Sequence, residues 1–361
     1  MRIPAESHLE GLLRWQPPGG VVSVYVDLRP EDWGEPWRIE LRNGLSEARK
    51  AADDPSERAL AATAERIEER LNAEREAPSG RTRIGFVEAS ERPGREEWFA
   101  VQARLAETEV AYAARPVIGP LVALLDGHAP RGVAAVSAER IRLMRWSLAG
   151  IEELEAWGLE IFSLDWRERK AQRSSDPAQM QGTKASGHDQ FEQRLEANRE
   201  RFLHEAGRLA ASELKRRGCT ELLAFGEPEH VRALAEGAAG TELGVRAVAP
   251  KDLISEPLDG ILARVSEHLL QLQRERELAL VDRVRAEADA DGRGAFGAKA
   301  TSRALVEGRV EHLLLAPELA AEAESMVEAA LETSARVTQV HAEDATEALA
   351  DADGVAALLR Y

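Results

Sequence analysis

The chain has 361 residues, of which 44% are hydrophobic and 31% charged, and its formal net charge is −17. This length favours two or three domains with sizeable cores, and the composition is globular rather than disordered. The acidity argues against a general DNA-coating protein, because phosphate binding rests mainly on Lys and Arg. Apolar runs are too short for a membrane span, no signal-peptide stretch follows Met1, and the single cysteine, Cys219, excludes an internal disulfide. We therefore expect a cytoplasmic protein.

The first region, residues 1–115, has the pattern of a sheet covered by helices. Val21–Leu28 is rich in β-branched residues and follows a Pro-Pro-Gly-Gly turn, which predicts a buried strand. A helix with one apolar face opens at Pro55, and two shorter strand candidates follow at Arg83–Val87 and Trp98–Val101. The alternation predicts an α/β domain.

Three acidic residues near the first strand, Asp27, Glu31 and Asp32, form no recognisable metal-ligand spacing. No histidine lies among them, so we interpret them as turn residues at a strand end. We expect neither a metal site nor a cofactor.

The second region begins at Pro116–Pro120, where two prolines flank a short apolar stretch and mark a crossing between domains. Strands and helices then alternate, which predicts another α/β domain. Strands are predicted at Gly132–Ser137, Arg140–Trp146, Leu159–Phe162, Glu221–Phe225 and Val245–Val248, and a helix at Pro228–Ala235.

Between Asp165 and Gln190 the chain is polar and has no strand pattern. A loop of this size exceeds the roughly 12–15 residues usual for an unstructured connection, which marks it as functional or disordered. Its cations are Arg167, Arg169, Lys170, Arg173 and Lys184. They outnumber its acids by one, against the sign of the whole chain, so we predict that these cations contact RNA phosphates.

A long helix is predicted to begin near Gln190. Its apolar face carries Phe191, Leu195, Phe202, Ala206, Leu209 and Ala210. Arg194, Arg201, Arg208 and Lys215 recur every seven residues and therefore form a basic stripe. The stripe alone is explained by a solvated helix face in which Glu205 pairs with Arg208. Next to the polar loop it becomes a candidate contact to the RNA backbone, made by Arg194, Arg201 and Arg208.

The third region follows a helical pattern at Leu258–Ala288 and a turn-rich stretch from Asp289. Gly292, Gly294 and Gly297 lack the Gly-Lys-Ser/Thr ending of a phosphate loop, so we interpret them as a turn into a helix. A compact α/β pattern comes next. Helices are predicted at Lys299–Glu307, Glu318–Leu331 and Glu343–Ala350, and strands at Val310–Leu315, Arg336–Val340 and Val355–Leu359.

Two motifs in this third region resemble the last domain of archaeo-eukaryotic class-1 release factors and Pelota. The first runs from Gly294-Ala295-Phe296-Gly297 to Gly308-Arg309-Val310, and the second is the ending Gly354–Tyr361, which closes in Leu-Arg-Tyr. The middle region also looks like that family's peptidyl-transferase-centre domain. The resemblance implies the bacterial release-factor-like branch, which includes Balon-like hibernation factors.

From the resemblance we expect an α/β fold of three domains, each a mixed sheet flanked by helices. The boundaries are 1–115, 116–272 with the loop 165–190 and the long basic helix, and 273–361 as the release-factor-like C-terminal domain.

The family's Gly-Gly-Gln loop, which positions the water that hydrolyses peptidyl-tRNA, matches Gly187-His188-Asp189-Gln190 only in part. One residue is inserted and the second glycine is absent, and this chemistry tolerates little displacement. Gly187, His188 and Gln190 are the candidate catalytic residues, with His188 as an alternative general base. The sequence leaves open whether the protein is an enzyme.

The first region also lacks an Asn-Ile-Lys-Ser signature for stop-codon decoding. The leading hypothesis is a ribosome-binding factor of the release-factor/Pelota type that enters the A site for hibernation or rescue. Its partners would be large-subunit rRNA and a translational GTPase, with no membrane and no DNA. The alternatives are a peptidyl-tRNA hydrolase that uses Gln190 and an acidic scaffold that binds no RNA.

Overall fold

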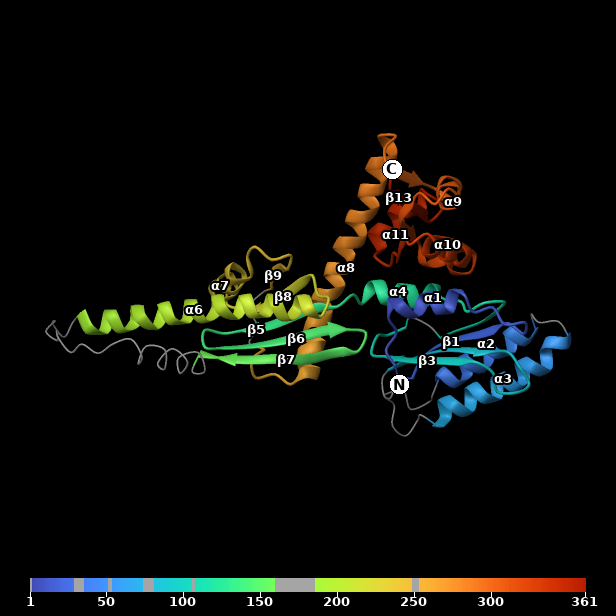
Figure 1. Ribbon diagram of the computed structural model, residues 1–361, viewed down its shortest axis with the longest axis horizontal. Helices are drawn as coiled ribbons and strands as arrows, with labels where there is room; N and C mark the ends of the chain where they lie inside the picture. Colours follow the sequence, from blue (N-terminus) through green and yellow to red (C-terminus); the bar gives the residue numbers. More distant parts are fainter. Residues whose placement is uncertain are drawn as a thin grey trace. The chain divides into compact units, whose positions relative to one another are not determined.

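A computed structural model describes residues 2–28, 36–50, 54–73, 81–105, 108–159, 186–248 and 253–361. The chain forms two compact units (Figure 1). Unit 1 combines Met1–His128 with Ser266–Tyr361, and unit 2 is Ala129–Val265. The predicted division at 115/116 and 272/273 stays a prediction. Among the described residues, no helix combines the length and apolar character needed to cross a membrane.

The N-terminal part of unit 1 is an antiparallel sheet in the order β3-β2-β1-β4. Its strands are β1 (Val21–Asp27), β2 (Thr82–Glu88), β3 (Glu96–Val101) and β4 (Glu109–Ala113), and its helices are α1 (Glu6–Leu13), α2 (Pro36–Lys50) and α3 (Asp54–Ala73). Alternate residues Val22, Val24 and Val26 face a core that α2 and α3 complete. Tyr25, on the other face of β1, meets Phe86 edge to face. Covering on both faces explains why every residue of β1 is buried.

The C-terminal part of unit 1 is a sheet in the order β10-β13-β11-β12, in which only β11 and β12 are parallel. Its strands are β10 (Gly294–Phe296), β11 (Val310–Leu315), β12 (Arg336–Gln339) and β13 (Val355–Leu359). Its helices are α9 (Ala298–Val306), η1 (Pro317–Leu319), α10 (Ala320–Glu332) and α11 (Glu343–Ala350). The core joins β11 and β13 to α11 and to α8 (Leu258–Asp289), which brings Val281 and Val284. The same unit contains α4 (Gly119–Gly127).

Unit 2 is a five-stranded sheet in the order β7-β6-β5-β8-β9. Its elements are β5 (Arg131–Val136), β6 (Arg140–Ser147), β7 (Gly150–Gly158), α6 (Ser186–Arg216), β8 (Glu221–Gly226), α7 (Pro228–Ala238) and β9 (Gly244–Val248). Strands β5, β8 and β9 are parallel, whereas β6 and β7 pair antiparallel. In Figure 1, α6 runs along this sheet beside α7. Helices thus cover one face and complete its core.

The expected α/β architecture is confirmed, with three sheets flanked by helices in the part of the chain that the structure describes. The N-terminal sheet differs from the expected mixed sheet because all pairs among its four strands are antiparallel. The third strand of unit 2 is β7, which ends directly before the strand predicted at Leu159–Phe162. The prediction was therefore wrong for Leu159, which is not in a strand. The next three residues lie outside the described ranges. Gly294 belongs to a short strand, β10, rather than to a turn alone.

Candidate nucleic-acid interface on helix α6

The buried face of α6 fixes the orientation of the helix on the sheet of unit 2. Phe202, Ala206 and Ala210 are buried, which confirms the predicted apolar face at these positions. Leu203 and Leu214 are buried with them. With this stripe against the sheet, the remaining side of α6 is left to face solvent.

Two glycines set how closely α6 packs against α7. A Cβ atom on Gly207 would lie 2.1 Å from the carbonyl oxygen of Leu234, and one on Gly237 would lie 2.0 Å from that of His204. Both distances are far shorter than any real contact, so only glycine permits this reciprocal approach of backbones. The pair holds α6 in a fixed position along its middle.

Most of the predicted loop residues lie outside the described residues. This applies to Arg167, Arg169, Lys170, Arg173 and Lys184. Gly187, His188 and Gln190 lie in the first turns of α6, which begins at Ser186, and their side chains are not among those described. Their proposed catalytic roles stay predictions.

The cations of the predicted stripe are placed on the solvent side of α6. Arg194, Arg201 and Arg208 are all exposed, as is Lys215. Arg208 forms the expected pair with Glu205, with a nitrogen–oxygen distance of 3.4 Å, and Lys215 lies 3.3 Å from Glu242. The Arg208 and Glu205 side chains are 65% and 49% exposed, so the pair contributes little to stability and can exchange for a phosphate.

Arg199 was missed by the sequence analysis. Its guanidinium lies 2.7 Å from the Glu139 carboxylate, which joins α6 to the turn between β5 and β6. Residues 60 positions apart carry no sequence signal for such a pair. Arg199 is therefore tied to the body of unit 2.

The buried cation Arg142 fixes the entry to α8 within unit 2. Arg142 forms two hydrogen bonds to the Glu153 carboxylate, at 3.0 and 2.8 Å, and these bonds lower the pKa of Glu153. The same guanidinium donates to the backbone carbonyls of Leu253 and Ile254, at 3.4 and 3.1 Å, and of Glu256, at 2.6 Å. The guanidinium of Arg142 is thus engaged in hydrogen bonds within unit 2, so Arg142 is not a candidate for RNA contact.

Chemistry other than phosphate contact finds little support in the part of unit 2 that is described. Burial raises the pKa of the Cys219 thiol, which disfavours the reactive thiolate. In the described ranges of the whole chain, no three His, Cys, Asp or Glu side chains gather as metal ligands would. The exposed cations of α6 are the candidate site in the described part of unit 2.

The segment that contains this site is similar to a known protein family. Residues 116–274 match the family model "Bacterial archaeo-eukaryotic release factor family 10". The match is shorter than half of the chain, but it includes all of unit 2. The middle segment of the chain is therefore similar to a bacterial release-factor family, which confirms for this segment the resemblance found in its sequence. No curated protein matches the chain.

Among solved structures, the archaeal translation termination factor aRF1 is similar at 18% identity, over 98% of this chain and 96% of its own, with a TM-score of 0.26. Ribosome-bound archaeal Pelota with ABCE1 aligns at 16% identity over 78% and 77%, with a TM-score of 0.43. Dom34 of S. cerevisiae, a translation termination-like factor that interacts with Hbs1, aligns at 11% identity over 78% and 80%, with a TM-score of 0.41. At these values the similarities carry no argument about function.

Proposed function

We propose that this protein is a ribosome-associated translation factor of the release-factor and Pelota type, which occupies the A site in hibernation or rescue. The observation that carries the proposal is the match of residues 116–274 to a bacterial release-factor family, a segment that contains the exposed cations of α6. The setting would be the cytoplasm, where ribosomes are found.

Phosphate contact is the physical basis of the proposal. Cations spaced by seven residues stay on one side of a helix, and α6, with 31 residues, is about 46 Å long. Each guanidinium group of such a row can bind a phosphate of the rRNA backbone, because arginine binds phosphate in a fork geometry. The net charge of −17 disfavours general RNA binding, so contact depends on local cations such as these.

Occupancy is favoured over peptide release and over decoding by features of the sequence. Gly187–Gln190 has an inserted residue and lacks the second glycine, and the first region has no Asn-Ile-Lys-Ser. A translational GTPase stays the expected protein partner, as the resemblance found in the sequence implies.

Co-sedimentation with ribosomes tests the proposal. The wild-type chain should pellet with ribosomes at low salt, and the triple variant Arg194→Glu, Arg201→Glu and Arg208→Glu should lose at least tenfold in affinity. A control with the same charge change reverses Arg14, Arg232 and Arg303, whose side chains are 79%, 77% and 82% exposed. Equal losses in both variants would contradict the proposed face. No association of the wild type at low salt would favour the acidic scaffold.

Peptide release from loaded ribosomes separates occupancy from hydrolysis. We expect no release by the wild-type chain and unchanged ribosome binding by Gln190→Ala. Release that disappears in Gln190→Ala would instead establish the hydrolase alternative, with Gln190 positioning the water.

A further inference from the structure

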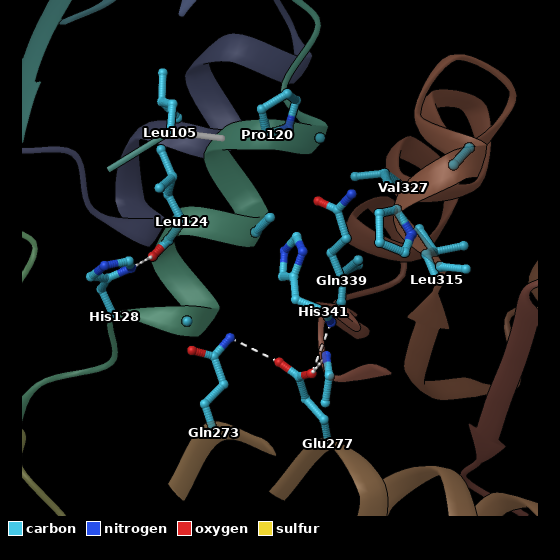
Figure 2. A pocket seen from close by; sticks show the side chains of 18 of the residues that line it. Leu105, Pro120, Leu124, His128, Gln273, Glu277, Leu315, Val327, Gln339 and His341 are labelled. Carbon is cyan, nitrogen blue, oxygen red and sulfur yellow. Dashed lines mark hydrogen bonds between the residues drawn. The ribbon is translucent and has the colours of Figure 1, made fainter. Parts of the chain in front are cut away.

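Unit 1 contains a cavity of about 700 Å³ that the α6 site does not involve (Figure 2). Pro120 and Leu124 of α4 line one side, and Leu315 and Val327 of the C-terminal part line another. Leu105, which precedes β4, adds to the apolar wall. The volume lies within the range of small-molecule sites, which are mostly apolar with a few placed polar groups.

Two carboxylates that line the cavity are already used to build its walls. Glu277 of α8 accepts hydrogen bonds from the amides of His341 and Ala342, at 2.8 Å each, and from Nε2 of Gln273 at 2.8 Å. Figure 2 shows the bonds from Gln273 and His341 as dashed lines. Glu324 of α10 accepts from the amides of Ile118 and Gly119 at the start of α4, at 2.6 and 3.0 Å. Both carboxylates satisfy amides at helix starts.

The third carboxylate of the cavity, Glu109, has no such role. It is half-buried at the first position of β4, and its side chain forms no hydrogen bond or ion pair with the described residues. Burial raises its pKa, and burial also raises the pKa of Glu324, with a smaller contribution from the nearby Glu109 charge. Partial burial without a partner disfavours the ionised form of this carboxyl group relative to water. A cation placed beside the carboxylate stabilises the ionised form.

The other charges around the cavity do not remove this preference. Arg104 and Arg274 also line it, but their side chains are exposed and therefore screened by water. His128 donates from Nδ1 to the Leu124 carbonyl oxygen, 3.0 Å away, and His341 is exposed. The interior thus presents carboxylates and apolar walls, which disfavours an anion.

We propose that this cavity binds a small organic cation with an apolar body, an alkylammonium or arylammonium group. Its ammonium contacts the Glu109 carboxylate, and its hydrocarbon part packs between α4 and the wall that contains Leu315 and Val327. The ammonium donates hydrogen bonds that the surrounding chain does not supply to Glu109, and the apolar part gains free energy by leaving water.

Ligand-observed NMR on the full chain without ribosomes tests this proposal, so its outcome is independent of the proposed function. Hexylammonium, hexanol and hexanoate share one hydrocarbon length and differ in charge. Hexylammonium should bind about tenfold more tightly than hexanol, and hexanoate should bind most weakly. Equal binding of hexylammonium and hexanol, or no binding of either, would overturn the proposal.

Substitutions at two carboxylates locate the contact. Glu109→Gln should abolish the preference for hexylammonium while hexanol still binds, which shows that the cavity remains formed. Glu47→Gln, at an exposed position on α2, is the matched control and should keep the preference. Loss of the preference in Glu47→Gln to the same extent would mean that net charge alone attracts the amine, and the assignment to Glu109 would fail.

Discussion

The two longest helices of the described chain, α6 with 31 residues and α8 with 32, both carry many charged residues. They differ in what these charged side chains contact. In unit 1, charged side chains of α8 contact other elements of the fold. Glu277 accepts hydrogen bonds from the amides at the start of α11, and Arg276 lies 3.3 Å from Asp126 of α4. The stripe cations of α6 remain exposed, and Arg208 and Lys215 pair with the exposed side chains of Glu205 and Glu242. Substitution should therefore damage stability on α8 and binding on α6.

The largest expected effect is on α8, at Glu277. This residue is 2% exposed, and Glu277→Ala leaves the amides of His341 and Ala342 without their acceptor. We expect the free energy of unfolding to fall by about 2–5 kcal/mol. Hydrogen exchange of the β11 and β13 amides under increasing urea measures this loss. Glu267→Ala, at an exposed position of the same helix, should stay within about 0.5 kcal/mol of wild type. Equal effects of the two variants would remove the distinction between the helices.

The next effect concerns His312. It is the last member of a chain of polar contacts that begins at Arg276 of α8 and passes through Asp126 and Thr338. Asp126 accepts from the Thr338 hydroxyl at 2.8 Å, and His312 Nε2 lies 2.7 Å from that same hydroxyl oxygen. Since the hydroxyl hydrogen is given to Asp126, the oxygen accepts from an Nε2–H, which fits a neutral imidazole. Burial lowers the pKa of His312 from 6.5 to about 4.

The pKa of His312 sets the sign of the pH dependence. Between pH 6.5 and 4 the unfolded chain binds a proton that the folded chain does not, so stability falls as the pH falls. Across this window the loss from His312 is about 3 kcal/mol. Urea unfolding at a series of pH values should show a loss smaller by that amount in His312→Gln. An unchanged profile would mean that His312 does not titrate as its burial requires.

These networks show what the sequence can and cannot predict. The strands Val310–Leu315 and Val355–Leu359 were predicted with their observed bounds, because local apolar patterns specify them. Strand β7 was misplaced because Glu152, Glu153 and Glu155 give it the polar character of an edge strand. The partners of Glu277 lie 64 and 65 positions away, and no local pattern specifies contacts at such separations.

The candidate site was predictable to the same limited extent. Periodicity alone placed Arg194, Arg201 and Arg208 opposite the buried face of α6, since both depend on the helical repeat. The pairing of Lys215 with Glu242 depends on the turn before β9 and was not predicted. The cavity of unit 1 was missed entirely because its walls come from segments around residues 104–128 and 270–342.

A smaller effect on stability is expected where α6 meets α7. Gly237→Ala would place a methyl group 2.0 Å from the carbonyl oxygen of His204, so the two helices must separate. We expect unit 2 to lose about 1–3 kcal/mol, measured by urea unfolding. Gly11→Ala in α1, where no atom lies within 4 Å of the added group, should be neutral or stabilising. A neutral Gly237→Ala would show that α6 is not fixed by this contact.

The smallest effect sharpens the binding side of the comparison. In the proposed contact, Glu205 competes with the rRNA backbone for Arg208, whose guanidinium lies 3.4 Å from the Glu205 carboxylate. Removing the competitor with Glu205→Gln should raise ribosome affinity about two- to fivefold, because an exposed pair of this kind is worth up to about 1 kcal/mol. Co-sedimentation at several salt concentrations measures the change.

A double-mutant cycle assigns this gain to Arg208 rather than to net charge. In an Arg208→Ala background, Glu205→Gln should give little further gain, since no guanidinium is left to release. Glu200→Gln makes the same charge change at another exposed position of α6 and should raise affinity less than Glu205→Gln. Equal gains from the two glutamates, kept without Arg208, would mean that the surface acts through its summed charge. The heptad stripe of α6 would then differ from the charges of α8 in exposure alone, and not in having a phosphate partner.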